Sequence, residues 1–566
     1  MYSELKSTWD ELTGPGQLFE IETLQVRGSP MRSYKHAPAS LRDIWLGTAA
    51  HQDREYLIFE QERCTYAQAH VFTASIANWL VQQGVQPGDR VAIAMRNYPE
   101  WMLSYWAVVS MGAVAVGMNA WWVADEMQFA LQDSAPKVLI CDKERLLRFN
   151  EIQADFPQLV VAAVRLREPA APNVVDWVEV INTEAVMPEV VIDPDDDACI
   201  FYTSGTTGKP KGAQLTHRGC VANLMNIGFS RALQSMALSR AGVKPKGEMA
   251  ADEVNVALVA TPLFHVTGNN CVAQGIAAVG GKLIHMYKWD AGEALRIIEE
   301  EKVTTFSAVP MMSREMLIHP DFATRDTSSL KSMGGGGAAV QPDLTKKVHA
   351  SMKNAAPNAG YGMTETCGII SALSGSYLVD RPTSVGRAMP TFEAKCVDGA
   401  GNTVATGQPG ELWVRGACVI KGYLNRPEAT AETITDGWLH TGDIAYMDED
   451  EFIYLVDRAK EMVLRGGENV YCAEVESAIF AHESVSECVV FGVEDERLGE
   501  EVGAAILPKE GETVDVARLR DYLGEKLSSY KIPRYIWLVE KPLPRNANGK
   551  FVKREVREML SLADAQ

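Results

Sequence analysis

A loop rich in small hydroxyl residues, glycines and lysines follows a short apolar segment near the middle of the chain. The apolar segment, Ile200 to Tyr202, is predicted to be a strand, and the string TSGTTGKPKG comes next. Glycines let the main chain approach a ligand closely, so that backbone N–H groups and hydroxyls bind phosphate oxygens while lysines supply charge. A polar hairpin turn is the competing interpretation, because the same composition marks turns generally. The predicted phosphate-binding residues are Thr203, Ser204, Gly205, Thr206, Thr207, Gly208, Lys209 and Lys211.

This loop does not follow the Walker A pattern, because Pro210 stands where that pattern requires Ser or Thr. The longer string YTSGTTGKPKG is instead similar to the phosphate-loop signature of the adenylate-forming superfamily, which includes acyl-CoA synthetases, aryl-CoA ligases, peptide-synthetase adenylation domains and luciferases. Further strings follow in the family's order, so the resemblance covers roughly residues 40 to 555. It implies ATP, Mg²⁺ and CoA as cofactors.

The string GYGMTET resembles the family's second core motif. By this resemblance Tyr361 stacks on adenine beside Gly362, and Thr364 binds the α-phosphate. Glu365 ligates Mg²⁺ together with Thr206. The chemistry agrees, because a flat aromatic ring suits a purine face and a carboxylate suits a hard cation shared with phosphate.

Two departures from the family pattern affect the predicted adenine site. Ala359 precedes the motif where many members have a polar residue, so a side-chain contact to adenine is absent there. The string MGGGGAAV resembles the family's Gly-Gly-Ala-Pro stretch, with Ala339 in place of proline. By the resemblance Gly337 and Ala338 lie along the adenine and the acyl group. A mobile surface loop is the alternative interpretation.

Asp443, in GWLHTGD, takes the ribose hydroxyls in the family, and Arg458 is expected near the same ribose. Lys460 stands at the family's hinge, where the small domain pivots. The string LRGGENV resembles a loop beside the pantetheine channel, with Gly466 and Gly467 leaving room for a thin thiol arm. An ordinary turn before a helix explains that last string equally well.

Two further motifs concern the acid. His265, in PLFHVTG, is expected near the substrate carboxylate, although a lone histidine in such a run is more often a core residue. Lys550, in PLPRNANGK, matches the C-terminal signature that carries the adenylation lysine, which bridges the substrate carboxylate and the α-phosphate. The resemblance therefore implies Lys550, Thr364, Glu365 and His265 as the catalytic set.

The elements that must position these residues alternate along the chain. Short apolar runs such as RVAIAM, KVLICD and TTFSAVP alternate with helical patterns, which predicts an α/β domain with largely parallel sheets. From about Ala388, alternating strands with Gly- and Asp-rich turns predict an antiparallel, small β-barrel-like region. The pattern of the last hundred or so residues predicts a small mobile α+β domain. The predicted organisation is an N-terminal extension (1–35), an AMP-binding domain of several subdomains (36–457) and a C-terminal lid (458–566).

Net charge, apolar segments and cysteine content indicate which partners and which cellular location to expect. The 566-residue chain has a formal net charge of −20, which makes nucleic acid a poor partner. The uncharged segment Trp101 to Val123 is long enough to span a bilayer, but Gly112 divides it, so we predict a buried helix and strand and no integral membrane segment. Ten scattered cysteines without CxxC pairs favour reduced thiols and a cytoplasmic location. No pattern decides between a monomer and a homodimer.

The expected function is an ATP-dependent acid–CoA ligase that forms acyl-AMP and transfers the acyl group to CoA. The residues expected around the acid are small or apolar and offer no partner for a second charge, which favours a hydrophobic monocarboxylate such as a medium- or long-chain fatty acid. An aromatic acid is the alternative substrate, and an acyl-AMP ligase loading a carrier protein is the alternative enzyme. A nucleotide-binding sensor without catalysis is the non-enzyme alternative; the presence of Lys550 and Glu365 argues against it.

Overall fold

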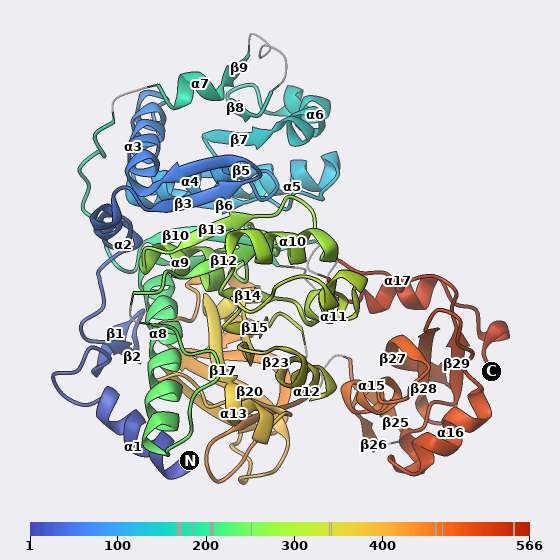
Figure 1. Cartoon of the computed structure of the whole chain (residues 1–566). Coiled ribbons are helices and arrows are strands. Elements are labelled where there is room, and N and C mark those ends of the chain that lie inside the picture. Colours follow the sequence, from blue (N-terminus) through green and yellow to red (C-terminus); the bar gives the residue numbers. More distant parts are fainter. Residues whose placement is uncertain are drawn as a thin grey trace.

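A computed structural model describes residues 1–166, 173–182, 185–203, 209–250, 252–338, 340, 342–458, 461–466, 468–546 and 549–566. Figure 1 shows a large body formed by the N-terminal and central parts of the chain, with a smaller C-terminal unit at its side. Mixed α/β architecture with parallel-rich sheets is confirmed.

Two eight-stranded sheets form the frame of the large body. Each is parallel in its middle and antiparallel at one or both edges. In order, the first sheet contains β21 (Gly422–Tyr423), β11 (Lys211–Thr216), β10 (Asp197–Thr203), β6 (Val114–Gly117), β5 (Arg90–Ala94), β7 (Val138–Asp142), β8 (Val160–Val164) and β9 (Val174–Asp176). The second contains β17 (Gly368–Ser374), β16 (Ala356–Met363), β15 (Ser332–Gly335), β14 (Thr305–Ala308), β12 (Val256–Val259), β13 (Lys282–His285), β3 (Glu55–Phe59) and β4 (Glu62–Thr65).

Helices connect and cover these strands, as parallel pairing requires. Those of the large body are α2 (Leu41–Gly47), α3 (Tyr66–Gln82), α4 (Pro99–Ser110), α5 (Ala124–Ser134), α6 (Lys143–Ile152), α7 (Trp177–Val180), α8 (His217–Arg240), α9 (Gln274–Ala278), α10 (Ala291–Glu301), α11 (Pro310–Ile318), α12 (Pro342–Ser351), α13 (Gly375–Asp380) and α14 (Pro427–Thr433).

The long uncharged segment is buried in the protein core, as predicted. It forms α4, a turn at Gly112 with φ +78°, and β6. Trp101, Tyr105 and Trp106 have no exposed surface. Among the described residues, no helix combines the length and the apolar character needed to cross a membrane.

The region after the second sheet is antiparallel, as expected. Its six strands are β18 (Ser384–Gly386), β19 (Phe392–Val397), β20 (Gly410–Gly416), β22 (Ile434–Thr435), β23 (Trp438–Met447) and β24 (Ile453–Arg458). The N-terminal segment is packed onto this body: it forms α1 (Tyr2–Leu12) and a hairpin of β1 (Ile21–Val26) and β2 (Ser29–Tyr34). Trp9 packs edge-on against Phe229 of α8, with ring centroids 4.8 Å apart.

The C-terminal unit has its own sheet and core. Its strands are β25 (Val463–Arg465), β26 (Glu468–Val470), β27 (Val485–Asp495), β28 (Gly499–Pro508) and β29 (Tyr535–Leu538), with helices α15 (Cys472–Phe480), α16 (Val516–Gly524) and α17 (Lys553–Glu558). Its apolar core is separate from those of the large body. Figure 1 places α17 on the side of this unit nearest α11.

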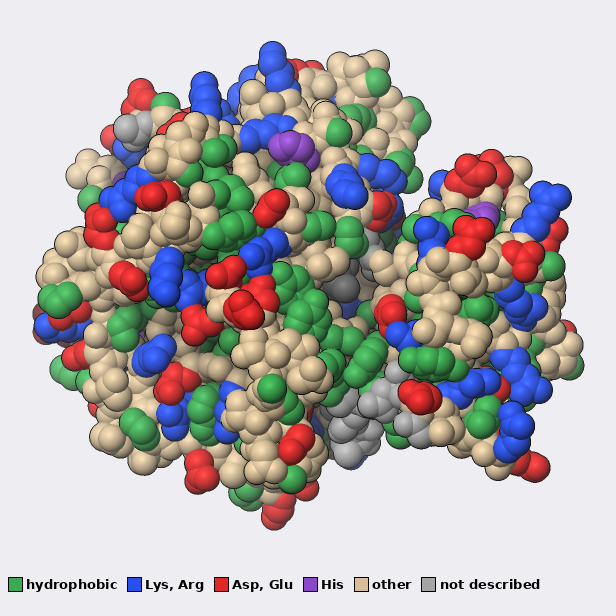
Figure 2. All heavy atoms as spheres, turned by 90° about the horizontal axis from the view of Figure 1, so that it is seen from below, with side chains coloured by type: hydrophobic (Ala, Val, Ile, Leu, Met, Phe, Trp, Pro, Cys, Tyr) green, Lys and Arg blue, Asp and Glu red, His purple; other side chains and the backbone are tan. Residues whose placement is uncertain are grey.

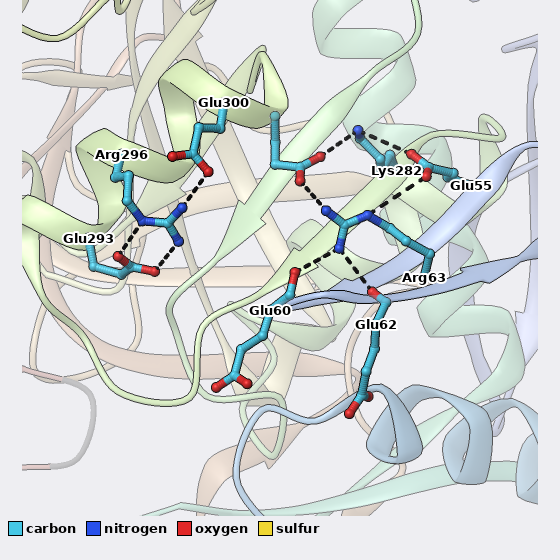
Figure 3. Close-up of polar contacts among 9 residues, drawn as sticks. Glu55, Glu60, Glu62, Arg63, Lys282, Glu293, Arg296 and Glu300 are labelled. Atoms are coloured by element: carbon cyan, nitrogen blue, oxygen red, sulfur yellow. Dashed lines mark hydrogen bonds and ion pairs between the residues drawn. The ribbon is translucent and has the colours of Figure 1, made fainter.

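Strand β4 forms the outer edge of the second sheet, and charged side chains form ion pairs along this edge (Figure 3). Arg63 of β4 lies 2.5 Å from Glu301, and Lys282 of β13 lies 2.9 Å from the same carboxylate. Glu55 joins the group at 3.4 Å from Lys282. Such exposed pairs contribute little each, but charged side chains keep an edge strand from pairing with another molecule.

Candidate functional site

A cavity of about 1420 Å³ lies where the large body meets the C-terminal unit. Seen from below, the surface is hollowed between the two parts (Figure 2). The residues at its wall come from both parts, and from the ends of β14, β15 and β16. In open α/β sheets, ligands bind beyond the carboxyl ends of the parallel strands, which is where this cavity begins. Of the predicted site residues, the cavity wall contains Thr203, Lys211, His265, Gly337, Gly362, Thr364, Glu365, Arg458 and Lys550.

The predicted phosphate loop joins two antiparallel strands. Thr203 ends β10 and pairs with Lys211 at the start of β11. The described strands on either side of the loop are antiparallel, and this pairing does not exclude phosphate binding, because Thr203 and Lys211 both line the cavity. Lys211 Nζ stands 4.8 Å from the ring centroid of Tyr423. Ser204, Gly205, Thr206, Thr207 and Gly208 lie outside the described residues.

Lys209 lies at the same loop but does not line the cavity. Its Nζ is 5.1 Å from the ring centroid of Phe129. This cation–π contact holds the ammonium on the α5 side. Lys211 is therefore the better placed of the two lysines to meet a phosphate in this arrangement.

Glu365 sits in a short turn between β16 and β17 and is only 7% exposed. Its Oε1 accepts a hydrogen bond of 2.8 Å from the Tyr423 hydroxyl, and burial raises the pKa of that phenol, so it remains a donor. No Lys or Arg among the described residues pairs with this carboxylate at ion-pair distance. A buried carboxylate that lines the cavity without a partner cation among the described residues fits a Mg²⁺ ligand.

Tyr361, Asp443 and Arg458 form a connected group beneath the cavity floor. The Tyr361 hydroxyl donates a hydrogen bond of 2.6 Å to Asp443. Arg458 Nε lies 2.8 Å from the other carboxylate oxygen, because Asp443 of β23 and Arg458 of β24 are direct cross-strand partners. Burial raises the pKa of Asp443, which Arg458 opposes. Arg458 lines the cavity, whereas Tyr361 and Asp443 are buried and do not line it, although their chain neighbours Gly360, Gly362 and Gly442 do.

Lys550 reaches the cavity from the C-terminal unit. The tight loop that carries it is closed by a bridge between Arg545 and Phe551, and the Asn546 N–H donates to the Lys550 carbonyl at 2.8 Å. Burial and the nearby Arg458 guanidinium lower the pKa of Lys550, while Asp443 opposes this shift. Gly549 has φ +75°, and a Cβ there would lie 3.2 Å from Val309 Cγ2 of the large body. The lysine-bearing loop is therefore docked against the large body.

His265 follows β12 and shares the cavity wall with Lys550. The Thr267 N–H donates to His265 Nδ1 at 3.3 Å, which leaves the proton of the neutral ring on Nε2. Burial, with Lys550 nearby, lowers the pKa of His265 to about 3. The ring is thus a neutral hydrogen-bond donor at physiological pH, suited to positioning a carboxylate rather than to transferring its proton.

Glycines keep the neighbouring strands close enough to form the cavity floor. A Cβ on Gly336 would lie 2.3 Å from the Gly360 carbonyl, and one on Gly362 would lie 1.9 Å from the Gly368 carbonyl. Gly337, with φ +81°, lines the cavity, but Ala338 is exposed and does not.

The predicted pantetheine loop is not part of this cavity. Gly466 occupies the turn between β25 and β26 with φ +60°, and its N–H donates to the Leu498 carbonyl at 2.7 Å. In this placement of the C-terminal unit it lies away from the cavity wall. Gly467 and the predicted hinge Lys460 lie outside the described residues.

The sequence patterns missed several functional candidates. Tyr423, which holds Glu365, stands in no motif. The cavity also extends along α8, where Leu224, Ile227 and Arg231 line it at helical spacing. The spacing of these three residues indicates that they share one face of a helix. Nothing in the sequence shows which face of a long helix contacts a ligand. No cluster of three or more His, Cys, Asp or Glu suited to a metal occurs within the described part of the chain.

Comparisons with known proteins agree with this geometry. Residues 46–424 match the family model described as AMP-binding enzyme, and residues 474–550 match the AMP-binding enzyme C-terminal domain. The chain is 35% identical to a feruloyl-CoA synthase of an Amycolatopsis species, over 87% of this chain and 93% of the relative. It is 30% identical to a long-chain-fatty-acid–CoA ligase of Bacillus subtilis, over 92% and 94%. A solved structure of the anthranilate CoA ligase AuaEII in complex with anthranoyl-AMP superposes with a TM-score of 0.81 at 25% identity, covering 92% and 97% of the two chains.

Proposed function

The chain belongs to the AMP-binding enzyme family, and from that premise we propose that its acid substrate has an elongated apolar body and enters the cavity between His265 and Lys550. The reaction is ATP-dependent ligation of a carboxylic acid to CoA through acyl-AMP, with ATP, Mg²⁺ and CoA as cofactors. One observation carries the proposal: a single cavity contains the docked Lys550, the buried Glu365 and an apolar extension.

Adenylation must bring two anions together. A carboxylate oxygen attacks the α-phosphate of ATP, and pyrophosphate leaves. We assign Lys550 to the substrate carboxylate and α-phosphate, because its loop is docked here and its ammonium is desolvated. Thr364 and Lys211 also line the cavity and supply a hydroxyl and a second cation to the phosphates. Such preorganised charges act more strongly in a water-poor site.

Glu365 is assigned to Mg²⁺, with the Tyr423 hydroxyl orienting its carboxylate. Mg²⁺, when bound, offsets phosphate charge, and it commonly takes one or two protein carboxylates together with phosphates and water. Asp443 is assigned to the ribose, and the Tyr361 hydroxyl and Arg458 fix the direction of its oxygens. His265 orients the acid through its Nε2 proton.

The second half-reaction transfers the acyl group to the CoA thiol, and AMP leaves. We propose that the C-terminal unit swings for this step, because Gly466 does not line the cavity in the present placement. The predicted boundary at residues 457 and 458 remains a prediction, with the pivot at or near Lys460. Proteolysis that cuts here at different rates with and without acyl-AMP would support the movement.

Two relatives support an elongated apolar acid without choosing its type. One is named for ferulate and another for long-chain fatty acids, and both acids carry a carboxylate at the end of an extended uncharged body. Pyrophosphate release and acyl-CoA formation across fatty and hydroxycinnamic acids test the proposal. Turnover of neither class would contradict it.

We propose a cytoplasmic location, supported by ten cysteines that are all free thiols, as expected in a reducing compartment. The oligomeric state stays open between a monomer and a homodimer, and we propose the homodimer as the state to be tested. Light scattering after size-exclusion chromatography would decide it, and a mass of one chain at working concentration would contradict it.

A further inference from the structure

The cavity has a branch that runs away from the reacting groups along α8. Three residues of one helix face line it, Leu224, Ile227 and Arg231, at the i, i+3 and i+7 positions of a helix. The facing wall comes from the segment before α9 and from α9 itself, with Val272 and Ile276. The opposite side of α8 packs against α1, so this wall is held in place.

Two hydrogen bonds between α8 and β17 give a length scale along this part of the cavity. Near the reacting groups, the Asn223 side chain accepts a hydrogen bond of 2.9 Å from the Ile369 N–H, just after the Glu365 turn. At the other end, the Gln234 side chain accepts one of 2.7 Å from the Ser374 N–H. Helix rise puts these two levels roughly 16 Å apart, and the strand rise of β17 gives about the same length. Arg231 then lies roughly 12 Å beyond the level of Asn223.

The branch has free space, and its apolar wall gives way to polar side chains at the far end, where Ser230, Arg231 and Gln234 line it. A Cβ on Gly275, which lines it, would meet no atom within 4 Å. A Cβ on Gly228 would touch only the Phe19 ring, at 3.8 Å. An extended chain advances roughly 1.2 Å per bond, so roughly 12 Å corresponds to about ten bonds. A medium-length acyl body therefore fills the branch and places its far end at Arg231.

Arg231 has no anionic partner among the residues that the structure describes. Its Nη1 has one long contact, 3.4 Å from the Asn255 side-chain oxygen. Within the described part of the chain, no carboxylate lies at ion-pair distance of Arg231. The residue keeps exposed surface at the cavity, and partial desolvation by the surrounding protein lowers the pKa of its guanidinium. The adjacent polar groups are already used: the Gln234 amide donates to Ser230 Oγ at 2.8 Å and accepts from Ser374. A guanidinium has five N–H donors, so most of these remain available to a ligand.

We infer that the preferred substrate carries a second anionic group at the far end of its apolar body and that Arg231 binds this group. The inference rests on the proposed function, since the first carboxylate must be the one that is adenylated. It revises the expectation that no partner for a second charge exists. An α,ω-dicarboxylic acid of medium length has the required chemistry, because a carboxylate accepts two parallel hydrogen bonds from a guanidinium.

The test compares α,ω-dicarboxylic acids with monocarboxylic acids of equal length, from roughly eight to fourteen carbons. Acyl-CoA formation gives kcat/KM for each acid. We expect the wild type to prefer the dicarboxylate near the length set by the branch. Arg231→Met removes the charge and should lower kcat/KM for the dicarboxylate by roughly 10- to 100-fold, while the monocarboxylate is unchanged or improved. Arg231→Lys should recover part of the preference.

A charge swap separates binding from a structural role. Arg231→Glu should reject the dicarboxylate and favour an ω-amino acid of the same length, which a merely structural arginine would not produce. Arg240→Met is the matched control, because Arg240 lies on the same helix and pairs with Glu11 outside the cavity. The control should leave the ratio of dicarboxylate to monocarboxylate turnover unchanged.

The possible outcomes distinguish failure of this inference from failure of the proposed function. Equal use of both acid classes by the wild type, with no change of ratio in Arg231→Met, overturns the inference and leaves the acid–CoA ligase intact. No turnover of any acid overturns both the proposed function and the inference. Gly275→Leu adds an independent check on the branch: it should abolish turnover of medium-length acids of either class but retain that of acids too short to reach residue 275.

Discussion

Replacing Lys550 by Ala should slow the first half-reaction by roughly 10²- to 10³-fold and spare the second. Lys550 is docked beside Arg458 and Glu365, and its pKa is lowered by burial, so its ammonium acts from a desolvated position. Two unit charges about 3 Å apart interact by roughly 5 kcal/mol at an effective dielectric constant of about 20. Removing one preorganised donor costs about 3 kcal/mol in comparable sites. Because Arg458 remains in the cavity, we expect the lower figure, a loss of roughly 10²- to 10³-fold in acyl-AMP formation.

The assay separates the two chemical steps. Pyrophosphate release from ATP and acid measures adenylation, and acyl-CoA formation from supplied acyl-AMP measures thioester formation. Lys541→Ala is the control, since Lys541 is an exposed lysine of the same segment. The lysine must also be charged, so adenylation should decline as pH rises through its lowered pKa, earlier than for an ordinary lysine. Equal loss in both steps, or no loss in adenylation, would refute the reasoning.

The remaining predictions use other contacts of the same structure. Tyr423→Phe removes the hydroxyl that orients Glu365 and should raise the Mg²⁺ concentration for half-maximal adenylation by about 10- to 100-fold; an unchanged Mg²⁺ titration counts against the assignment. Gly549→Ala places a Cβ 3.2 Å from Val309 Cγ2 at φ +75°, so adenylation should fall by roughly 5- to 30-fold and thioester formation should not; parallel losses would mean that this contact does not belong to one step alone. His285 is buried with its pKa lowered to about 3, so the fold loses stability as pH falls from 6.5 towards that value, by about 1.4 kcal/mol per pH unit for this group. His285→Gln should flatten the decline of Tm over this range, and an identical decline would show that His285 titrates normally in the fold.

The sequence predicts most of what depends on local order along the chain. Alternating apolar runs place β5, β7 and β14 correctly, and Gly112 correctly divides the uncharged segment between α4 and β6. The motif order also brings His265, Glu365 and Lys550 to one cavity although they are far apart in the chain. These features follow from periodicity and from strings whose chemistry is tied to fixed positions.

What the sequence does not predict depends on packing between distant segments. Tyr423 acquires its importance only because β21 pairs with β11 and brings its hydroxyl to Glu365. In the sequence, nothing distinguishes Arg231 from other arginines in helices. Only the structure shows that its face of α8 lines the cavity. The N-terminal segment appears as an extension but packs through Trp9 against the far side of the same helix. Each case requires the tertiary structure, because burial and partners decide the role of a polar side chain.

The placement of Arg458 limits where the C-terminal unit can pivot. Arg458 is the last residue of β24 and is held opposite Asp443 by strand pairing and an ion pair. The first strand of the C-terminal unit begins at Val463, and the N–H groups of Glu461 and Met462 both donate to the Arg458 carbonyl. A swing that kept the β23–β24 pairing must therefore turn about the few residues between Arg458 and Val463. Arg458 would then stay with the nucleotide in both placements while Lys550 leaves, which is the physical reason why loss of the lysine should affect only one of the two reactions.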